Sequence, residues 1–292
     1  LALTGDAAAT NLVLSRVNDP EPLVREAVAR AIRTLGAKKH LLHVVGMLKD
    51  PRLRVIAAAR EVLEAMTGQK FGFDAAAWEM WLLDPEKRPA KPPAGGESVS
   101  RYYGMEILSD RVLFLVDTSG SMNAGKPSRI EVARKELATT LSRLNRRTVF
   151  SVAGFGGSPR WWSDRARPAT PATIADAKKF VEGLSVGGET NLFDALVQAL
   201  DRHREADTIF LLGDGCPSAG KVTEHDGIRV RIRWLNRMRK LKIHSIAFVD
   251  RPVPLNRPRT VPARREEDAH EAADLLLRLA EENAGTYVRR EN

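Results

Sequence analysis

Three apolar runs, separated by amphipathic segments, are the feature of this 292-residue sequence that most limits its possible folds. The runs are Val112–Val116, Thr208–Leu212 and Ile243–Val249. A strand that is buried on both faces has such a continuous run, because neither of its sides meets water. Helices that connect parallel strands cover the two faces of the sheet. The pattern therefore predicts an α/β domain with a doubly wound, mostly parallel sheet.

Capping signals mark the helices that we expect between these strands. Ser128 and Glu131 form a capping box at the start of one helix, and Thr170-Pro171 opens another. The last helix is expected over Ala269–Ala284, closed by Gly285 before a short final strand. Two further strands are expected at Val149–Phe155 and Arg160–Trp162.

Residues 1–83 have a different pattern, in which a pair of helices recurs. Asp19-Pro20 and Asp50-Pro51 each separate two helical segments, and apolar residues follow both at the same offsets. We interpret each aspartate as an N-cap and each proline as part of the first turn of the next helix. The sequence therefore predicts an all-α domain of repeated helix pairs.

This pattern resembles the HEAT repeat, in which helix pairs stack into a solenoid. A generic helical bundle is the alternative. Ile56 stands where the repeat pattern has an arginine, which removes one polar contact between repeats. Since such repeats bury their faces only against neighbours, we expect further repeats upstream of this sequence.

A segment rich in proline and glycine, residues 84–100, follows the repeats, and we interpret it as a linker. It would separate the helical domain, residues 1–83, from an α/β domain over residues 101–292. We expect proteases to cut there, because an exposed linker has few packed side chains.

Composition excludes several classes of protein. No apolar run is long enough to span a bilayer. The only cysteine, Cys216, excludes an internal disulfide and a cysteine-rich zinc site, and the six histidines lack the spacing of metal ligands. The formal net charge of +9 comes largely from scattered arginines, so we do not expect nucleic-acid binding. No signal segment indicates a compartment.

Oxygen-bearing residues follow two of the predicted strands. Asp117, Ser119 and Ser121 come after the first, and Asp214 comes after a later one. A glycine-rich loop between them carries Thr190. Carboxyl ends of parallel strands meet at one edge of a sheet, so we expect these five side chains to converge. Oxygen donors alone are the ligands of a hard cation such as Mg²⁺ or Mn²⁺.

This arrangement resembles the von Willebrand factor A domain and its metal-ion-dependent adhesion site. The resemblance covers residues 101–292 and implies that Asp117, Ser119, Ser121, Thr190 and Asp214 hold the metal. It implies a protein-binding or scaffold module, not an enzyme, whose metal binds an Asp or Glu side chain of a partner protein. Two aspartates would leave bound Mg²⁺ near charge neutrality, with at least one coordination position held by water.

A phosphatase of the haloacid-dehalogenase type is the alternative, with Asp117 as nucleophile. Such enzymes have a second aspartate where this sequence has Ser119, and a serine cannot serve as the general acid. Ser218 likewise stands where their late motif has a carboxylate. An accessory subunit of a metal-dependent enzyme complex is a further alternative.

Overall fold

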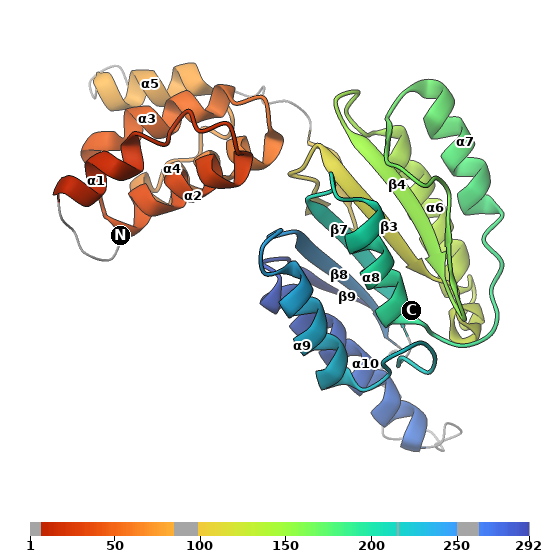
Figure 1. Ribbon diagram of the computed structural model, residues 1–292. Coiled ribbons are helices and arrows are strands. Elements are labelled where there is room, and N and C mark those ends of the chain that lie inside the picture. Colours follow the sequence, from red (N-terminus) through yellow and green to blue (C-terminus); the bar gives the residue numbers. More distant parts are fainter. Residues whose placement is uncertain (1–6, 85–98, 215, 250–262, 292) are drawn as a thin grey trace, which may run out of the picture. The chain divides into compact units, whose positions relative to one another are not determined.

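The structure, a computed structural model, describes residues 7–84, 99–214, 216–249 and 263–291. The chain divides into two compact units (Figure 1). One comprises Leu1–Val99 and Leu108–Asp110, and the other comprises Ser100–Ile107 and Arg111–Asn292. Most of the predicted linker, residues 85–98, lies outside the described residues. Within the described ranges, no helix has both the length and the apolar character needed to cross a membrane.

The first unit contains only helices and turns in its described part before residue 85. The α-helices are α1 (Ala7–Leu14), α2 (Pro22–Thr34), α3 (Leu41–Gly46), α4 (Leu53–Thr67) and α5 (Ala75–Leu83). Their apolar stripes bury a common core that includes Ile32, Leu63 and Trp78. The predicted all-α organisation is therefore observed in this part of the chain.

The predicted N-caps of α2 and α4 are wrong. α2 begins at Pro22 with Glu21 as its N-cap, and α4 has Arg52 in that place. The Asp19 side chain instead accepts a hydrogen bond from the Glu21 amide at 2.9 Å, and Asp50 accepts one from the Arg52 amide at 2.8 Å. An aspartate readily accepts from the amide two residues ahead, so these residues form turns before the helices.

Arg25 of α2 joins the first helix pair to the second. Its Nε donates to Asp50 Oδ2 at 2.6 Å, and its Nη2 donates to Asp50 Oδ1 at 2.9 Å. Its Nη1 donates to the Asp19 carbonyl oxygen at 2.7 Å. Ile56 occupies the same offset in the second pair, so this contact cannot be repeated from there.

The second unit is built on a mixed, mostly parallel sheet. Within the described residues it has seven strands, and the order along its main path is β5-β4-β3-β7-β8-β9, with β6 paired to β4. The pairs that join β4, β3, β7, β8 and β9 are parallel, and β5 and β6 are antiparallel to β4. The strands are β3 (Arg111–Asp117), β4 (Val149–Phe155), β5 (Pro159–Trp161), β6 (Arg167–Pro168), β7 (Thr208–Gly213), β8 (Lys242–Val249) and β9 (Tyr287–Glu291).

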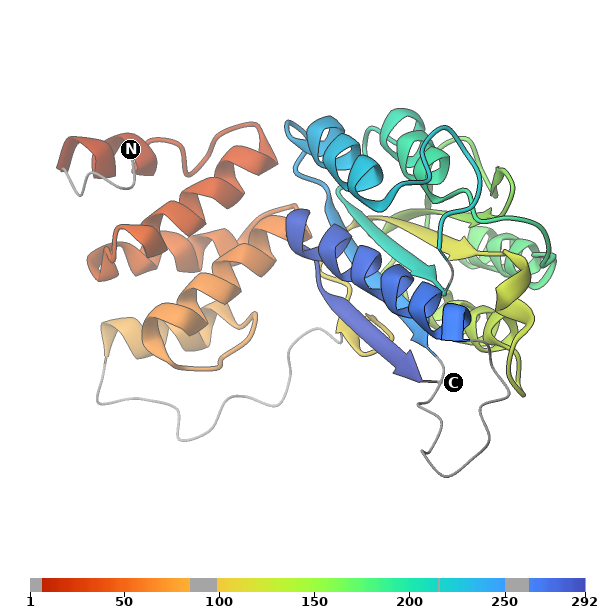
Figure 2. The same cartoon turned by 90° about the horizontal axis from the view of Figure 1, so that it is seen from below.

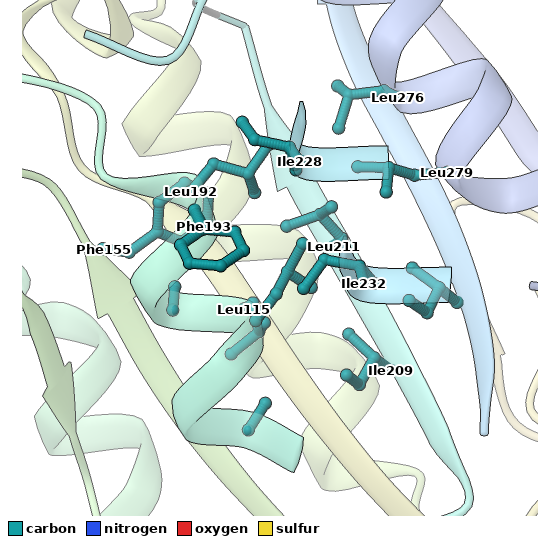
Figure 3. Close-up of a cluster of buried hydrophobic side chains, with 14 of the residues drawn as sticks. Leu115, Phe155, Leu192, Phe193, Ile209, Leu211, Ile228, Ile232, Leu276 and Leu279 are labelled. Carbon is teal, nitrogen blue, oxygen red and sulfur yellow. The ribbon is translucent and has the colours of Figure 1, made fainter. Parts of the chain in front are cut away.

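Helices cover both faces of this sheet, as the apolar strands predict (Figure 1). The helices are α6 (Arg129–Ser142), α7 (Pro171–Glu182), α8 (Leu192–Arg202), α9 (His225–Asn236) and α10 (Ala263–Glu282). Leu115 of β3 packs with α8, α9 and α10 on one face (Figure 3). Leu113 belongs to the same core, whereas Phe114 packs with α6 and α7 on the other face. A small hairpin, β1 (Arg101–Tyr102) and β2 (Met105–Glu106), adds to the second core.

α10 is followed by β9 at the end of the described chain (Figure 2). The turn between them requires a glycine for a steric reason. The left-handed residue after the helix is Ala284, with a φ of 52°, and not Gly285. A Cβ at Gly285 would overlap the carbonyl oxygen of Ile243 in β8. Gly285 therefore allows two backbone segments to approach each other. Its place after the last helix was predicted correctly, but this role was not.

Candidate metal centre

The carboxyl ends of β3 and β7 carry the candidate site. The chain passes from β3 to β4 and later returns to β7, on the other side of β3. In open α/β sheets, ligands bind at such a reversal, outside the carboxyl ends of the strands. β3 ends at Asp117 and β7 ends at Gly213, so Asp117 and Asp214 both lie at this point.

The loop after β3 positions three of the predicted ligands, Asp117, Ser119 and Ser121. The Ser119 amide donates to Asp117 Oδ1 at 2.7 Å, and the Ser119 and Ser121 hydroxyl oxygens lie 3.0 Å apart. A short 3-10 helix over Gly120–Asn123 follows, and Met122 anchors it in the core with no exposed surface. Met122 thus anchors the loop, in which Ser119 is buried and Ser121 is exposed.

Asp214 meets this loop from β7. The Ser121 hydroxyl donates to Asp214 Oδ1 at 2.7 Å. Its other oxygen, Oδ2, accepts from Arg129 at the start of α6. The side chains of this ion pair are 0% exposed for Asp214 and 7% exposed for Arg129. Asp214 is therefore paired on both of its oxygens.

Backbone hydrogen bonds position the loop that carries Thr190. The Gly187 amide donates to the Thr118 carbonyl at 2.9 Å, and the Gly120 amide donates to the Gly188 carbonyl at 3.2 Å. These bonds hold the Thr190 loop against the loop that follows β3. Thr190 itself is buried, at 5% exposure. Its hydroxyl forms no hydrogen bond with the other four side chains in the described structure.

Asp117 is the electrostatically unusual residue of the site. It is fully buried, and its Oδ2 has no hydrogen-bond partner. Burial, followed by the nearby charge of Asp214, raises the pKa of Asp117 to about 7. A buried carboxylate oxygen without a partner is costly unless a cation balances it. The residues present therefore fit a bound cation.

The sequence did not predict that Arg129 belongs to the site. It directly follows the capping residue Ser128, and sequence alone does not distinguish it from the exposed arginines of an amphipathic helix. Its charge changes the expected balance of the site. Two aspartates and one arginine sum to one negative charge, so a bound divalent cation would leave the site positive by one unit.

Comparison with known proteins gives the class of this unit. Residues 110–254 match the family model for the von Willebrand factor type A domain. This match, together with the mixed, mostly parallel sheet and its covering helices, supports a von Willebrand factor A domain in this part of the chain. Domains of this class are typically metal-dependent protein-interaction modules.

Inter-alpha-trypsin inhibitor heavy chains are among the similar proteins. Human heavy chain H2 is 31% identical over 129 residues, which are 40% of this chain and 13% of the relative. Heavy chain H4 of the pig is 33% identical over 136 residues, which are 41% of this chain and 14% of the relative. The chain thus spans about a seventh of the length of these relatives.

Solved structures with low sequence identity also resemble the chain. A von Willebrand factor type A protein from Catenulispora acidiphila has a TM-score of 0.48 and 18% identity, over 63% of this chain and 39% of its own. Proximal thread matrix protein 1 of the mussel byssus, with a zinc-occupied MIDAS motif, has a TM-score of 0.44 and 17% identity, over 61% of this chain and 40% of its own.

Proposed function

We propose that this domain binds a partner protein through a divalent cation, Mg²⁺ or Mn²⁺. The ion would be held by Asp117, Ser119, Ser121, Thr190 and Asp214, directly or through water. The observation that carries the proposal is the fully buried Asp117, whose Oδ2 has no hydrogen-bond partner. A hard cation coordinated by oxygen atoms would balance this charge.

The partner group that we propose is an Asp or Glu side chain. With Arg129 close by, the loaded site would carry one net positive charge, which favours an anionic ligand. A carboxylate is also a hard oxygen donor, as Mg²⁺ and Mn²⁺ prefer. Arg129 thus strengthens the expectation of an acidic partner beyond that from the five ligands alone.

An enzymatic role is less consistent with the geometry. A phosphatase of the haloacid-dehalogenase type needs a second acid near Asp117, and Ser119 has no acidic proton to give. The Ser218 hydroxyl accepts a hydrogen bond from the Thr190 amide at 2.9 Å, so Ser218 supports the loop. We therefore propose a binding role for the domain. We also propose that the helical unit consists of HEAT-like repeats and provides a second binding surface.

Mn²⁺ gives a direct test of the open coordination position. Bound Mn²⁺ speeds the relaxation of water protons, and a carboxylate that displaces its water reduces this effect. We expect acetate to reduce the relaxation enhancement of the wild-type domain, whereas formamide, a neutral ligand of similar size, should have little effect. Asp117→Ala should abolish Mn²⁺ binding. Tight Mn²⁺ binding by Asp117→Ala would contradict the proposal. A relaxation enhancement that acetate does not change would also contradict it.

Partner binding provides the second test. Chelator should release a captured partner, and Mg²⁺ or Mn²⁺ should restore its binding. Thr190→Ala should lower the affinity for the partner more than the affinity for the metal. The Thr190 hydroxyl is neutral and therefore adds little attraction for the ion. Ser142→Ala, an exposed serine on α6, is the matched control and should change neither.

A further inference from the structure

We propose a second metal site, formed by Cys216, His225 and Glu271, for a borderline cation of the Zn²⁺ type. Its residues do not include any proposed ligand of the first site. The inference goes beyond the proposed adhesion function and does not depend on it. It is based on the positions of three side chains from separate segments.

The donor atoms are already close together. One sulfur, one imidazole nitrogen and one carboxylate oxygen, from Cys216, His225 and Glu271, all lie within 4.8 Å of one another. Zinc bonds of roughly 2.0–2.3 Å place the ligands of a tetrahedral site about 3.3–3.7 Å apart. Small rotations of the side chains would therefore close the site around an ion. Three protein ligands would leave a fourth position for water.

The donor set determines which metal fits. Thiolate and imidazole favour Zn²⁺ over Mg²⁺, since Mg²⁺ takes hard oxygen ligands and gives up its water reluctantly. The candidate site at Asp117 has oxygen donors only. Mg²⁺ in excess would therefore compete with Zn²⁺ at the site of Asp117 but not at the cluster of Cys216, His225 and Glu271.

The surrounding fold holds two of the three segments, α9 and α10, against each other. α9 and α10 are joined near their carboxyl ends, where Asn236 Nδ2 donates to Asn283 Oδ1 at 2.8 Å. Ile232 of α9 and Leu279 of α10 belong to the same buried core (Figure 3). His225 is the first residue of α9, and its ring nitrogen lies within 4.8 Å of a carboxylate oxygen of Glu271 in α10.

The cluster of Cys216, His225 and Glu271 is accessible from solvent. Cys216 and His225 are half-buried, and Glu271 is exposed. An ion could therefore reach the cluster without unfolding the domain, and the half-buried sulfur and nitrogen would shield it once bound. The sequence did not indicate the site because its ligands come from the segment after β7, from α9 and from α10.

A zinc titration of the full chain tests the proposal. It uses a chromophoric chelator as competitor, with any affinity tag removed and Mg²⁺ in large excess to occupy the first site. We expect one equivalent of Zn²⁺ to remain bound. Cys216→Ser and His225→Gln should each weaken zinc binding by at least about tenfold. Glu271→Gln changes an exposed side chain, so it tests the site even where the other two variants fold poorly.

Two controls separate this site from its neighbours. His270→Gln removes a histidine next to Glu271 and should retain zinc binding. Asp117→Asn, which alters the first site, should also retain it. Loss of zinc in Asp117→Asn, or unchanged affinity in all three cluster variants, would place the zinc elsewhere and overturn the proposal. Failure of the adhesion function would not affect this result.

Co²⁺ gives an independent measurement. Co²⁺ bound to a thiolate has a charge-transfer absorption, which the wild-type chain should show and Cys216→Ser should lack. Zn²⁺, but not Mg²⁺, should also slow the alkylation of Cys216 by iodoacetamide. If Zn²⁺ does not change the alkylation rate but His225→Gln lowers it, Cys216 would be an activated nucleophile instead of a metal ligand.

Discussion

Arg129 and Asp214 form a buried ion pair at the carboxyl end of the sheet, although 85 residues separate them in the sequence. The pair leaves the two aspartates of the site in different electrostatic states. Arg129 compensates the charge of Asp214, whereas Asp117 has an oxygen without a partner and a raised pKa. Asp117 therefore carries the uncompensated charge that a metal would balance.

Arg129→Gln should destabilise the metal-free protein by roughly 3–5 kcal/mol, because it leaves Asp214 buried without its counter-charge. Saturating Mg²⁺ should restore much of this loss, since the variant should bind the cation more tightly than the wild type. Urea unfolding in chelator and in Mg²⁺ measures both effects. Lys135→Gln, an exposed position on the same helix, is the control. An equal loss in both solutions would show that Arg129 does not compete with the metal.

The pKa of Asp117 gives a pH dependence with a definite sign. The raised folded-state pKa, about 7 against the usual 3.8 of an aspartate, stabilises the metal-free protein at low pH. This stability is lost as pH rises from about 4 to about 7, by at most about 4 kcal/mol. Asp117→Asn keeps an acceptor for the Ser119 amide and should remove the dependence in chelator. An unchanged pH profile in this variant would contradict the assignment.

His244 should make the domain sensitive to acid. Burial, with the nearby charge of Lys242, lowers the pKa of His244 to about 4. Its Nδ1 accepts from the Thr286 amide at 3.0 Å, and its ring stacks on Phe210. Stability should be complete above about pH 6.5 and fall toward pH 4, by up to about 3 kcal/mol.

His244→Phe retains the stacking surface and removes the titrating group. The loss of stability between pH 7 and pH 4.5 should therefore be smaller in this variant than in the wild type. His270→Gln, at an exposed position, should leave the profile unchanged. Parallel profiles for His244→Phe and the wild type would contradict the prediction.

Arg25→Met should destabilise the helical unit by roughly 3 kcal/mol, because Asp50 loses a buried bidentate partner. Arg33→Met is the matched control. Arg33 pairs with Glu61 where both side chains are about half exposed, so its loss should cost less than about 1 kcal/mol. Hydrogen exchange of the α2 and α4 amides in the full chain measures both. Equal protection in the two variants would show that the Arg25 contact does not join the helix pairs.

The sequence predicted the central strands and several helix starts well. The run Val112–Val116 lies within β3, because a strand buried on both faces is a strong local signal. The predicted capping box of Ser128 and Glu131 is present, and Thr170 is the N-cap of α7, which the Thr170-Pro171 pair was predicted to open. The von Willebrand factor A fold followed from these elements and the resemblance.

Other features depend on contacts between distant segments. The Arg129–Asp214 pair and the cluster around Cys216 each join segments that no local pattern connects. The caps at Asp19 and Asp50 were wrong for a different reason, since a turn and an N-cap use the same residue type. Topology predicted that Asp117 and Asp214 lie at the same edge of the sheet, but it did not predict the charge of Arg129 beside Asp214.

Gly285 affects how inactive variants of this protein should be interpreted. Every other side chain there would meet the Ile243 carbonyl oxygen, far along the chain from the proposed ligands. A substitution at Gly285 should therefore abolish the proposed partner binding by disrupting the sheet edge, without any change in the proposed ligands. In a mutational screen, such a variant would be counted with Asp117→Ala unless protein abundance is measured alongside binding.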